Sequence, residues 1–444
     1  MATDDAGDTA GSPPSLGELT AVFGRIGLLS FGGPAAQIAM MHRVVVEEKR
    51  WLSEERFLHA LNYCMLLPGP EAQQLATYIG WLMHGTRGGV VCGLLFVLPG
   101  LVVITALSAA YALYQDATWL TGLFFGLKAA VLAIVVEAVI RLGRRTLESR
   151  FLLAIAAAAF IALFAFGIPF PIVVLVAGLI GFVAARSQNN VLPREDAGAA
   201  AFPARPPVLK ALMALATWIA LWLLPIPILW LMSAPDALSA LATFFSKIAL
   251  VTFGGAYAVL AYVAQVAVED YGWLRPGEML DGLALAETTP GPLVLVLSFV
   301  GFLVGFREAA GLGAIGGGII GALLVAWATF VPSFIWIFAG APFIERLRGN
   351  RTLSGALSAI TAAVVGVILN LALWFGLHVL FGEVQQVALV SSINLDLTLP
   401  VWTSLDLASL VLFLLSAFLL FRVRIGMVPV LAFGALAGLA VRTL

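Results

Sequence analysis

The segment VVCGLLFVLPGLVVITALSAAYAL, residues 90–113, contains no charged side chain. It is longer than the roughly 20 apolar residues that a helix needs to cross the hydrocarbon core of a bilayer. The whole chain is similar, because 61% of its residues are hydrophobic and only 11% are charged, whereas a soluble domain has about 25% charged residues. We therefore expect an all-α polytopic membrane protein, in which helices pair the backbone polar groups internally.

Two glycine-rich breaks interrupt the apolar pattern, and they have nearly the same sequence. SFGGP at residues 30–34 matches TFGGA at residues 252–256, and PGP at residues 68–70 matches PGP at residues 290–292, always at an offset of 222 positions. The match around these breaks needs no gap for about 50 residues. The chain is therefore a tandem duplication, and internal repeats are typical of many secondary transporters.

The duplication divides the chain into five parts. Each repeat is expected to hold six short or broken transmembrane helices, which with one extra helix between the repeats gives 13 segments. If the paired short segments are re-entrant hairpins, the number of spans falls to nine. The predicted parts are a disordered tail at 1–15, an N-terminal repeat at 16–185, a cytoplasmic linker at 186–209, a connecting transmembrane helix at 210–232 and a C-terminal repeat at 238–441.

Lysine and arginine residues in the loops orient the two repeats. Residues 141–150 are strongly basic, whereas the equivalent loop at 382–400 has no Lys or Arg; residues 345–351 are basic where the equivalent residues 114–117 are acidic. Basic loops remain in the cytoplasm. The pattern predicts that the two repeats are inverted in the membrane, with a cytoplasmic N-terminus and a periplasmic C-terminus.

The glycine and proline breaks predict a binding cavity. Glycine permits the positive φ that ends a helix, and proline is favoured at the first position of the next one. Non-helical backbone at membrane depth is tolerated only where it is buried in protein or lines a cavity. Helices that start at Pro34, Pro70, Ala256 and Pro292 would direct free N–H groups and positive dipole ends to that cavity. The expected ligand is an anion.

Polar and charged side chains near the breaks extend this prediction, although each alone is better explained by helix packing. Arg25 and Lys247 occupy equivalent positions about two turns before the breaks, where a cation is costly unless it is functional, paired or snorkelling. Glu71 and Glu287 flank the two turns and are candidates for proton coupling. The substrate-binding candidates are Arg25, Phe31, Gly32, Gly33, Pro34, Gln37, Pro68, Gly69, Pro70, Gln74, Lys247, Gly254, Gly255, Tyr257, Thr288, Thr289, Pro290, Gly291 and Pro292.

No other chemistry is indicated by the sequence. His42, His59 and His84 lack metal-ligand spacing, and Cys64 and Cys92 are isolated. The chain contains no phosphate-binding loop, nucleophile elbow or basic patch. We therefore expect no metal, no cofactor, no catalytic residues, no enzymatic activity and no nucleic-acid partner.

Residues 30–85 and 252–302 resemble the two repeats of the chromate ion transporter family, and the resemblance extends over about 16–441. Ser298 departs from it, because a glutamine is expected at that position. The family motifs fall on Phe31, Gly32, Gly33, Pro34, Trp51, Leu52, Pro68, Gly69, Pro70 and Gln74, and on Gly254, Gly255, Trp273, Pro290, Gly291 and Pro292.

The resemblance implies a long-chain, two-repeat chromate efflux protein of the bacterial inner membrane that confers chromate resistance. It implies energy from the membrane potential or the proton gradient and not from ATP. It also implies sulfate, a similar tetrahedral dianion, as a competitor, and a carrier of sulfate or another inorganic oxyanion is the alternative. The expected partners are chromate and the lipid bilayer, and a homodimer remains open.

Overall fold

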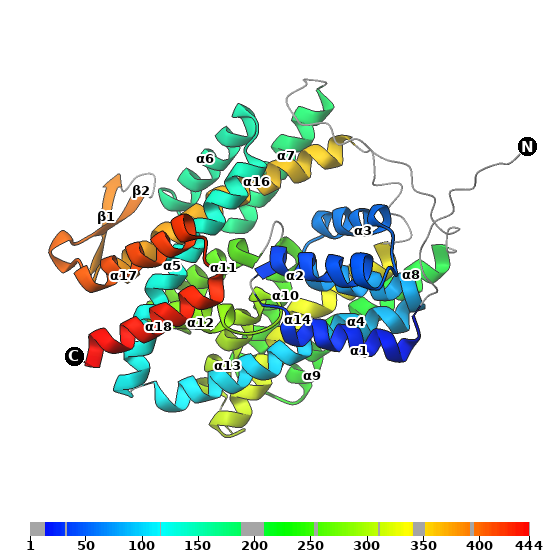
Figure 1. Cartoon of the computed structure of the whole chain (residues 1–444), viewed down its shortest axis with the longest axis horizontal. Helices are drawn as coiled ribbons and strands as arrows, with labels where there is room; N and C mark the ends of the chain where they lie inside the picture. The colour runs from blue at the N-terminus through cyan, green and yellow to red at the C-terminus, as the bar shows by residue number, and fades with distance from the viewer. Residues whose placement is uncertain are drawn as a thin grey trace, which may run out of the picture.

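The structure, a computed structural model, describes residues 14–31, 33–115, 117–187, 208–252, 256–309, 311–340, 351–390 and 395–443. Gly32, Gly254 and Gly255 lie outside the described residues, as do most of the predicted tail and linker. The described chain is almost entirely helical, as the sequence predicts. Figure 1 shows the helices of both repeats packed against one another.

The first repeat begins with a helix that is broken at the first glycine-rich stretch. α1 covers Leu16–Leu29, α2 covers Gly33–His42, and α2 passes into a π-helical turn, η1, at Arg43–Glu48. The side chain of Ser15 caps α1. Gly33 has a φ of 77°, which L side chains rarely adopt, so the break needs a residue without a Cβ at this position.

A turn at residues 68–70 separates the next two helices of the first repeat. α3 covers Glu54–Leu66 and α4 covers Glu71–Tyr114. The backbone of α4 is non-helical at His84 and Gly85, so α4 consists of two helical arms joined at a kink. The arms approach closely, because a Cβ on Gly80 or on Gly88 would collide with the carbonyl oxygen of the other glycine.

The second repeat has its helices in the same order, with an added 3-10 turn before α13 and an added π-helical turn after α14. Its helices α13 and α14 correspond to the two arms of α4 and also approach closely through glycines. A Cβ on Gly301 or on Gly321 would collide with the carbonyl oxygen of the other glycine. The elements are α10 Asp236–Val251, α11 Ala256–Gln265, the π-helical turn η2 Val266–Asp270, α12 Pro276–Glu287, the 3-10 turn η3 Leu293–Leu295, α13 Val296–Glu308, α14 Ala314–Ile335 and the π-helical turn η4 Trp336–Gly340.

Each repeat places its last pair of helices on the long helix of the other repeat. α5 packs against α17 and α18, and α16 packs against α6 and α7, as Figure 1 shows. The two repeats are therefore interlocked rather than stacked end to end. The elements are α5 Thr118–Thr146, α6 Arg150–Phe164, α7 Phe170–Arg186, α16 Arg351–Leu380, α17 Leu407–Phe418, the π-helical turn η8 Leu419–Val423 and α18 Met427–Thr443.

Two segments differ from the sequence-based expectation. The connecting helix predicted at 210–232 is broken into α8 Val208–Leu223 and α9 Pro225–Leu231, bent by 40°, because proline cannot continue the hydrogen-bond ladder of α8. The loop at 382–400, expected to lack regular structure, forms an antiparallel hairpin of β1 Val384–Val390 and β2 Leu395–Pro400. The described chain is therefore all-α in class, with one small β-hairpin.

Several helices are suited to a bilayer. Among the described residues, four helices are long and apolar enough to cross a membrane, and the bent pair α8 and α9 makes a fifth if it is one span. This is the architecture of a multi-pass membrane protein. The total of 13 segments remains a prediction, because many of the other helices are short. The four helices cover Glu71–Tyr114, Thr118–Thr146, Ala314–Gly340 and Thr352–Leu380.

The glycine contact between α5 and α18 gives a test of the interlocked packing. A Cβ on Gly126 would collide with the carbonyl oxygen of Gly434, so Gly126→Val should destabilise the protein by about 1–3 kcal/mol through overpacking. A Cβ on Gly24 meets nothing within 4 Å, and Gly24→Val is the matched control. The measurement is the thermal unfolding midpoint in detergent, and equal losses in both variants would contradict the packing.

Candidate functional site

Each proline-flanked turn is held by a hydrogen bond to the opposite repeat. The N–H of Gly69 donates to the carbonyl oxygen of Thr252 at 2.8 Å, and the N–H of Gly291 donates to the carbonyl oxygen of Ser30 at 2.7 Å. Residues 69 and 30 become 291 and 252 when the repeat offset of 222 is added, so the two bonds are equivalent. Both turns and both glycine-rich breaks therefore meet in one region.

The two turns require glycine at their centres. The φ angles are 121° at Gly69 and 94° at Gly291, in a region that other residues avoid. The space is also crowded, because a Cβ on Gly69 would lie 2.8 Å from Nε2 of Gln74, and one on Gly291 would lie 3.2 Å from the Leu295 side chain. The positive φ and the close packing therefore both require glycine at the centre of each turn.

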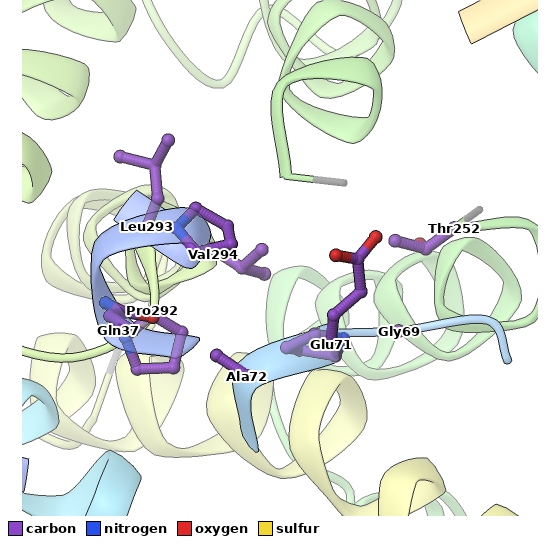
Figure 2. Close-up of a pocket in the computed structure, with 10 residues that line it drawn as sticks. Gln37, Gly69, Glu71, Ala72, Thr252, Pro292, Leu293 and Val294 are labelled. Atoms are coloured by element: carbon purple, nitrogen blue, oxygen red, sulfur yellow. The ribbon is translucent and has the colours of Figure 1, made fainter. Parts of the chain in front are cut away.

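A small pocket lies where these segments meet, as Figure 2 shows. Its volume is about 20 Å³, which is room for about one water molecule. The walls come from the starts of α2, α4 and η3 and from the end of α10, so both repeats contribute. The lining residues are Pro34, Gln37, Gly69, Pro70, Glu71, Ala72, Thr252, Pro292, Leu293 and Val294.

The backbone at the pocket wall favours a negative charge. The first N–H groups of a helix have no acceptor within that helix, and the helix dipole adds a partial positive charge there. α4 starts at Glu71, and η3, which continues directly into α13, starts at Leu293. The N–H groups of Ala72 and Val294 thus belong to two helix starts that line one pocket, an arrangement suited to oxyanions.

Glu71 extends its side chain into this pocket. Figure 2 shows its carboxylate between Thr252 and Val294. No hydrogen bond or ion pair joins Glu71 to another described residue. A carboxylate in the first turn of α4 is stabilised by the helix dipole. It also lies where a bound anion would be placed, so the two negative charges compete.

Three buried glutamines surround the turns. Nε2 of Gln37 donates to the carbonyl oxygen of Gly291 at 2.6 Å, and Nε2 of Gln74 donates to the carbonyl oxygen of Pro68 at 2.7 Å. In Gln37, Gln73 and Gln74, Oε1 is buried without a hydrogen-bond partner among the described residues. Such groups are uncommon in native interiors, so unused hydrogen-bond acceptors remain beside the turns.

Other predicted residues lie close by but use their polar groups within the protein. Glu287 is buried and accepts a hydrogen bond from the Tyr257 hydroxyl at 2.7 Å. The hydroxyls of Thr288 and Thr289 both donate to the carbonyl oxygen of Leu285. None of these four polar side chains lines the pocket. They support the second turn rather than face a ligand in this conformation.

Arg25 and Lys247 are not brought together with the breaks. Both side chains are exposed, on α1 and α10 respectively, and neither lines the pocket. Phe31, Gly33, Pro68 and Pro290 belong to the breaks and turns, but they do not line the pocket either. A role of Arg25 and Lys247 in binding therefore stays a prediction, and in this conformation neither residue contributes to the pocket.

The pocket also contains residues that the sequence analysis did not select. Ala72, Leu293 and Val294 lie at helix starts, and their small or apolar side chains give no chemical signal of a binding site. Thr252 is buried. The sequence contained a signal for this residue, because Thr252 is the first residue of TFGGA and the equivalent of Ser30 in the other repeat. Residues that precede a repeated break are therefore worth testing alongside the glycines.

Comparison with known proteins identifies the family. The chromate transporter family matches residues 17–182 and 239–439. A chromate transport protein of Pseudomonas aeruginosa is 36% identical over 372 residues, covering 83% of this chain and 82% of its own length. A probable chromate transport protein of Synechococcus elongatus is 30% identical over 390 residues, covering 87% and 92%. No solved structure matches the chain. With both repeats matched and a relative of this identity aligned over most of its length, the chain belongs to the chromate transporter family.

Proposed function

We propose that this protein transports chromate across the membrane and binds it in the pocket between the two Pro-Gly-Pro turns. Relatives named as chromate transport proteins support the substrate. The observation that carries the proposal is the convergence of helix starts from both repeats on one pocket. A tetrahedral oxyanion can accept hydrogen bonds from several N–H groups at once, as helix N-termini provide.

The pocket must widen to accept its substrate. A chromate ion is several times larger than a water molecule, whereas the pocket has a volume of about 20 Å³. The N–H groups of Gly69 and Gly291 bond to the opposite repeat, and Gln37 adds one more bond to the carbonyl oxygen of Gly291. A movement of one repeat against the other that breaks these few hydrogen bonds would open the site. Alternating access by such a movement is typical of transporters built from repeats.

Export from the cytoplasm is the direction that the charges favour. A dianion that leaves a negative cytoplasm gains about 2.3 kcal/mol per charge per 100 mV, so the membrane potential alone can drive efflux and confer chromate resistance. We place the protein in the bacterial inner membrane with inverted repeats, a cytoplasmic N-terminus and a periplasmic C-terminus. Gln115 and Arg442 line one cavity, which supports placing the 114–117 loop and the end of the chain on the same side.

In the proposed mechanism, Glu71 is the residue that couples proton binding to anion binding. A protonated Glu71 no longer repels an anion at the start of α4, so proton binding and anion binding should support each other. Glu287 is a weaker candidate, because the Tyr257 hydroxyl already binds its carboxylate and it does not line the pocket. Arg25 and Lys247 are left out of the proposed binding site because they are exposed.

Chromate flux in proteoliposomes tests the proposal. We expect saturable chromate transport that increases when the membrane potential drives anions across the bilayer, with sulfate as a weaker competitor. Vesicles without protein are the control for leakage. A much higher affinity for sulfate than for chromate would instead favour the alternative of a sulfate or general oxyanion carrier, and the absence of any oxyanion flux would overturn the proposed function.

A further inference from the structure

A second cavity lies apart from the pocket at the turns. It has a volume of about 330 Å³, much more than the central pocket. Its walls come from the end of α4, the first half of α5, the middle of α12 and the last turn of α18. The residues that matter here are Tyr111, Thr121, Phe125, Lys128, Asp281 and Arg442.

The inner part of this cavity holds an ion pair. Nζ of Lys128 lies 3.0 Å from Oδ1 of Asp281, and the Tyr111 hydroxyl donates to Oδ2 of Asp281 at 2.9 Å. The Asp281 side chain is 8% exposed, whereas that of Lys128 is 25% exposed, so the lysine is the partner that the cavity can reach. Charges within membrane-spanning helices are costly and often mark substrate pathways.

The outer part of the cavity adds a second cation. The guanidinium of Arg442 lies over the ring of Phe125, 4.5 Å from its centroid, and no ion pair joins it to a carboxylate of the described residues. The lining therefore carries two cations, Lys128 and Arg442, and one carboxylate, Asp281. The net charge of the lining is positive, which attracts anions into a concave, water-accessible site.

Helix α12 extends from this cavity towards the second Pro-Gly-Pro turn beside the central pocket. Asp281 lies in the middle of α12, and the end of that helix at Glu287 leads into the second Pro-Gly-Pro turn. Under the orientation proposed above, the cavity opens to the periplasm, because the end of α4, the start of α5 and the end of α18 meet there. It therefore lies on the side to which an exported anion would be released.

We propose that this cavity is a second oxyanion-binding site, in which Lys128 and Arg442 bind the anion and Asp281 competes with it for Lys128. The proposal rests on the proposed function, since it takes the same tetrahedral oxyanion as ligand. The anion reaching the cavity displaces Asp281 from Lys128, and the carboxylate returns to the lysine when the anion leaves. This competition keeps the site weak enough for release.

Equilibrium binding of chromate to the purified full chain in detergent tests the second site separately from transport. We expect two chromate ions per wild-type chain and one per Lys128→Met chain, with binding at the remaining site unchanged. Arg442→Gln should weaken the second site about tenfold, and Asp281→Asn should tighten it about tenfold by removing the competing charge. Arg422 is exposed and does not line the cavity, so Arg422→Gln is the matched control and should change nothing.

The neutral double variant Lys128→Met/Asp281→Asn separates binding from folding. The proposal predicts that it is as stable as the wild type and binds one chromate. It is overturned if the wild type binds a single chromate, if Lys128→Met keeps both, or if the double variant recovers the second one. Flux of the wild type in proteoliposomes decides the proposed function independently, because the binding count does not require transport.

Discussion

Glu71→Gln is expected to tighten chromate binding at the central pocket by at least about tenfold, which corresponds to about 1.4 kcal/mol. The carboxylate reaches into the pocket and forms no hydrogen bond or ion pair with another described residue. A dianion bound at the start of α4 therefore meets it at short range, where charge repulsion inside a protein amounts to several kcal/mol. Glutamine keeps the shape and removes the charge.

The same variant should lose most of the pH dependence of binding. In the wild type, acidification protonates Glu71 and removes the repulsion, so affinity rises as the pH falls; in Glu71→Gln there is no proton to add. Wild type and Glu71→Gln are compared at each pH, because protonation of chromate itself affects both proteins equally. Glu137→Gln is the control, because Glu137 pairs with Arg141 and does not line the pocket. Equal affinities for wild type and Glu71→Gln would remove Glu71 from the site.

Gly69→Ala and Gly291→Ala are each expected to reduce transport by more than about tenfold while the protein still inserts into the membrane. The φ angles of 121° and 94° would strain any residue with a Cβ by about 1–3 kcal/mol. The Cβ would also press on Gln74 or Leu295. Relaxation would move the N–H away from Thr252 or Ser30 and disturb the helix start beside it.

Gly167→Ala is the matched control for these two variants. Gly167 also has a positive φ, at 59°, but a Cβ there meets nothing within 4 Å. The strain of positive φ is then present without any change at the pocket, so stability should fall slightly while flux per inserted molecule stays normal. If Gly167→Ala loses as much transport as Gly69→Ala, the effect reports general destabilisation and not the binding site.

The sequence predicts a site at the breaks, because the same glycine and proline pattern occurs twice in an apolar chain. It could not show how the two copies pair. The equivalent hydrogen bonds from Gly69 to Thr252 and from Gly291 to Ser30 depend on tertiary packing between repeats. Small and apolar residues at helix starts, such as Ala72 and Val294, line the pocket without a recognisable signature in the sequence.

The side on which a helix presents a residue is not determined by its position in the sequence. Arg25 and Lys247 occupy equivalent positions, and a cation in an apolar helix suggested function, but both face outward. Their helices bury other faces, including Phe23 on α1 and Phe245 on α10, so packing decided the orientation. Lys128 on α5, by contrast, lies in a cavity beside Asp281.

Direct localisation of bound chromate is the decisive test of the account. In crystals of the protein grown with chromate, anomalous scattering from chromium should place one ion between the turns, within hydrogen-bonding distance of the N–H groups of Ala72 and Val294. The pocket would be wider than the present 20 Å³. A chromium peak beside Arg25 or Lys247, with no peak between the turns, would contradict the claim that helix starts of both repeats form the substrate site.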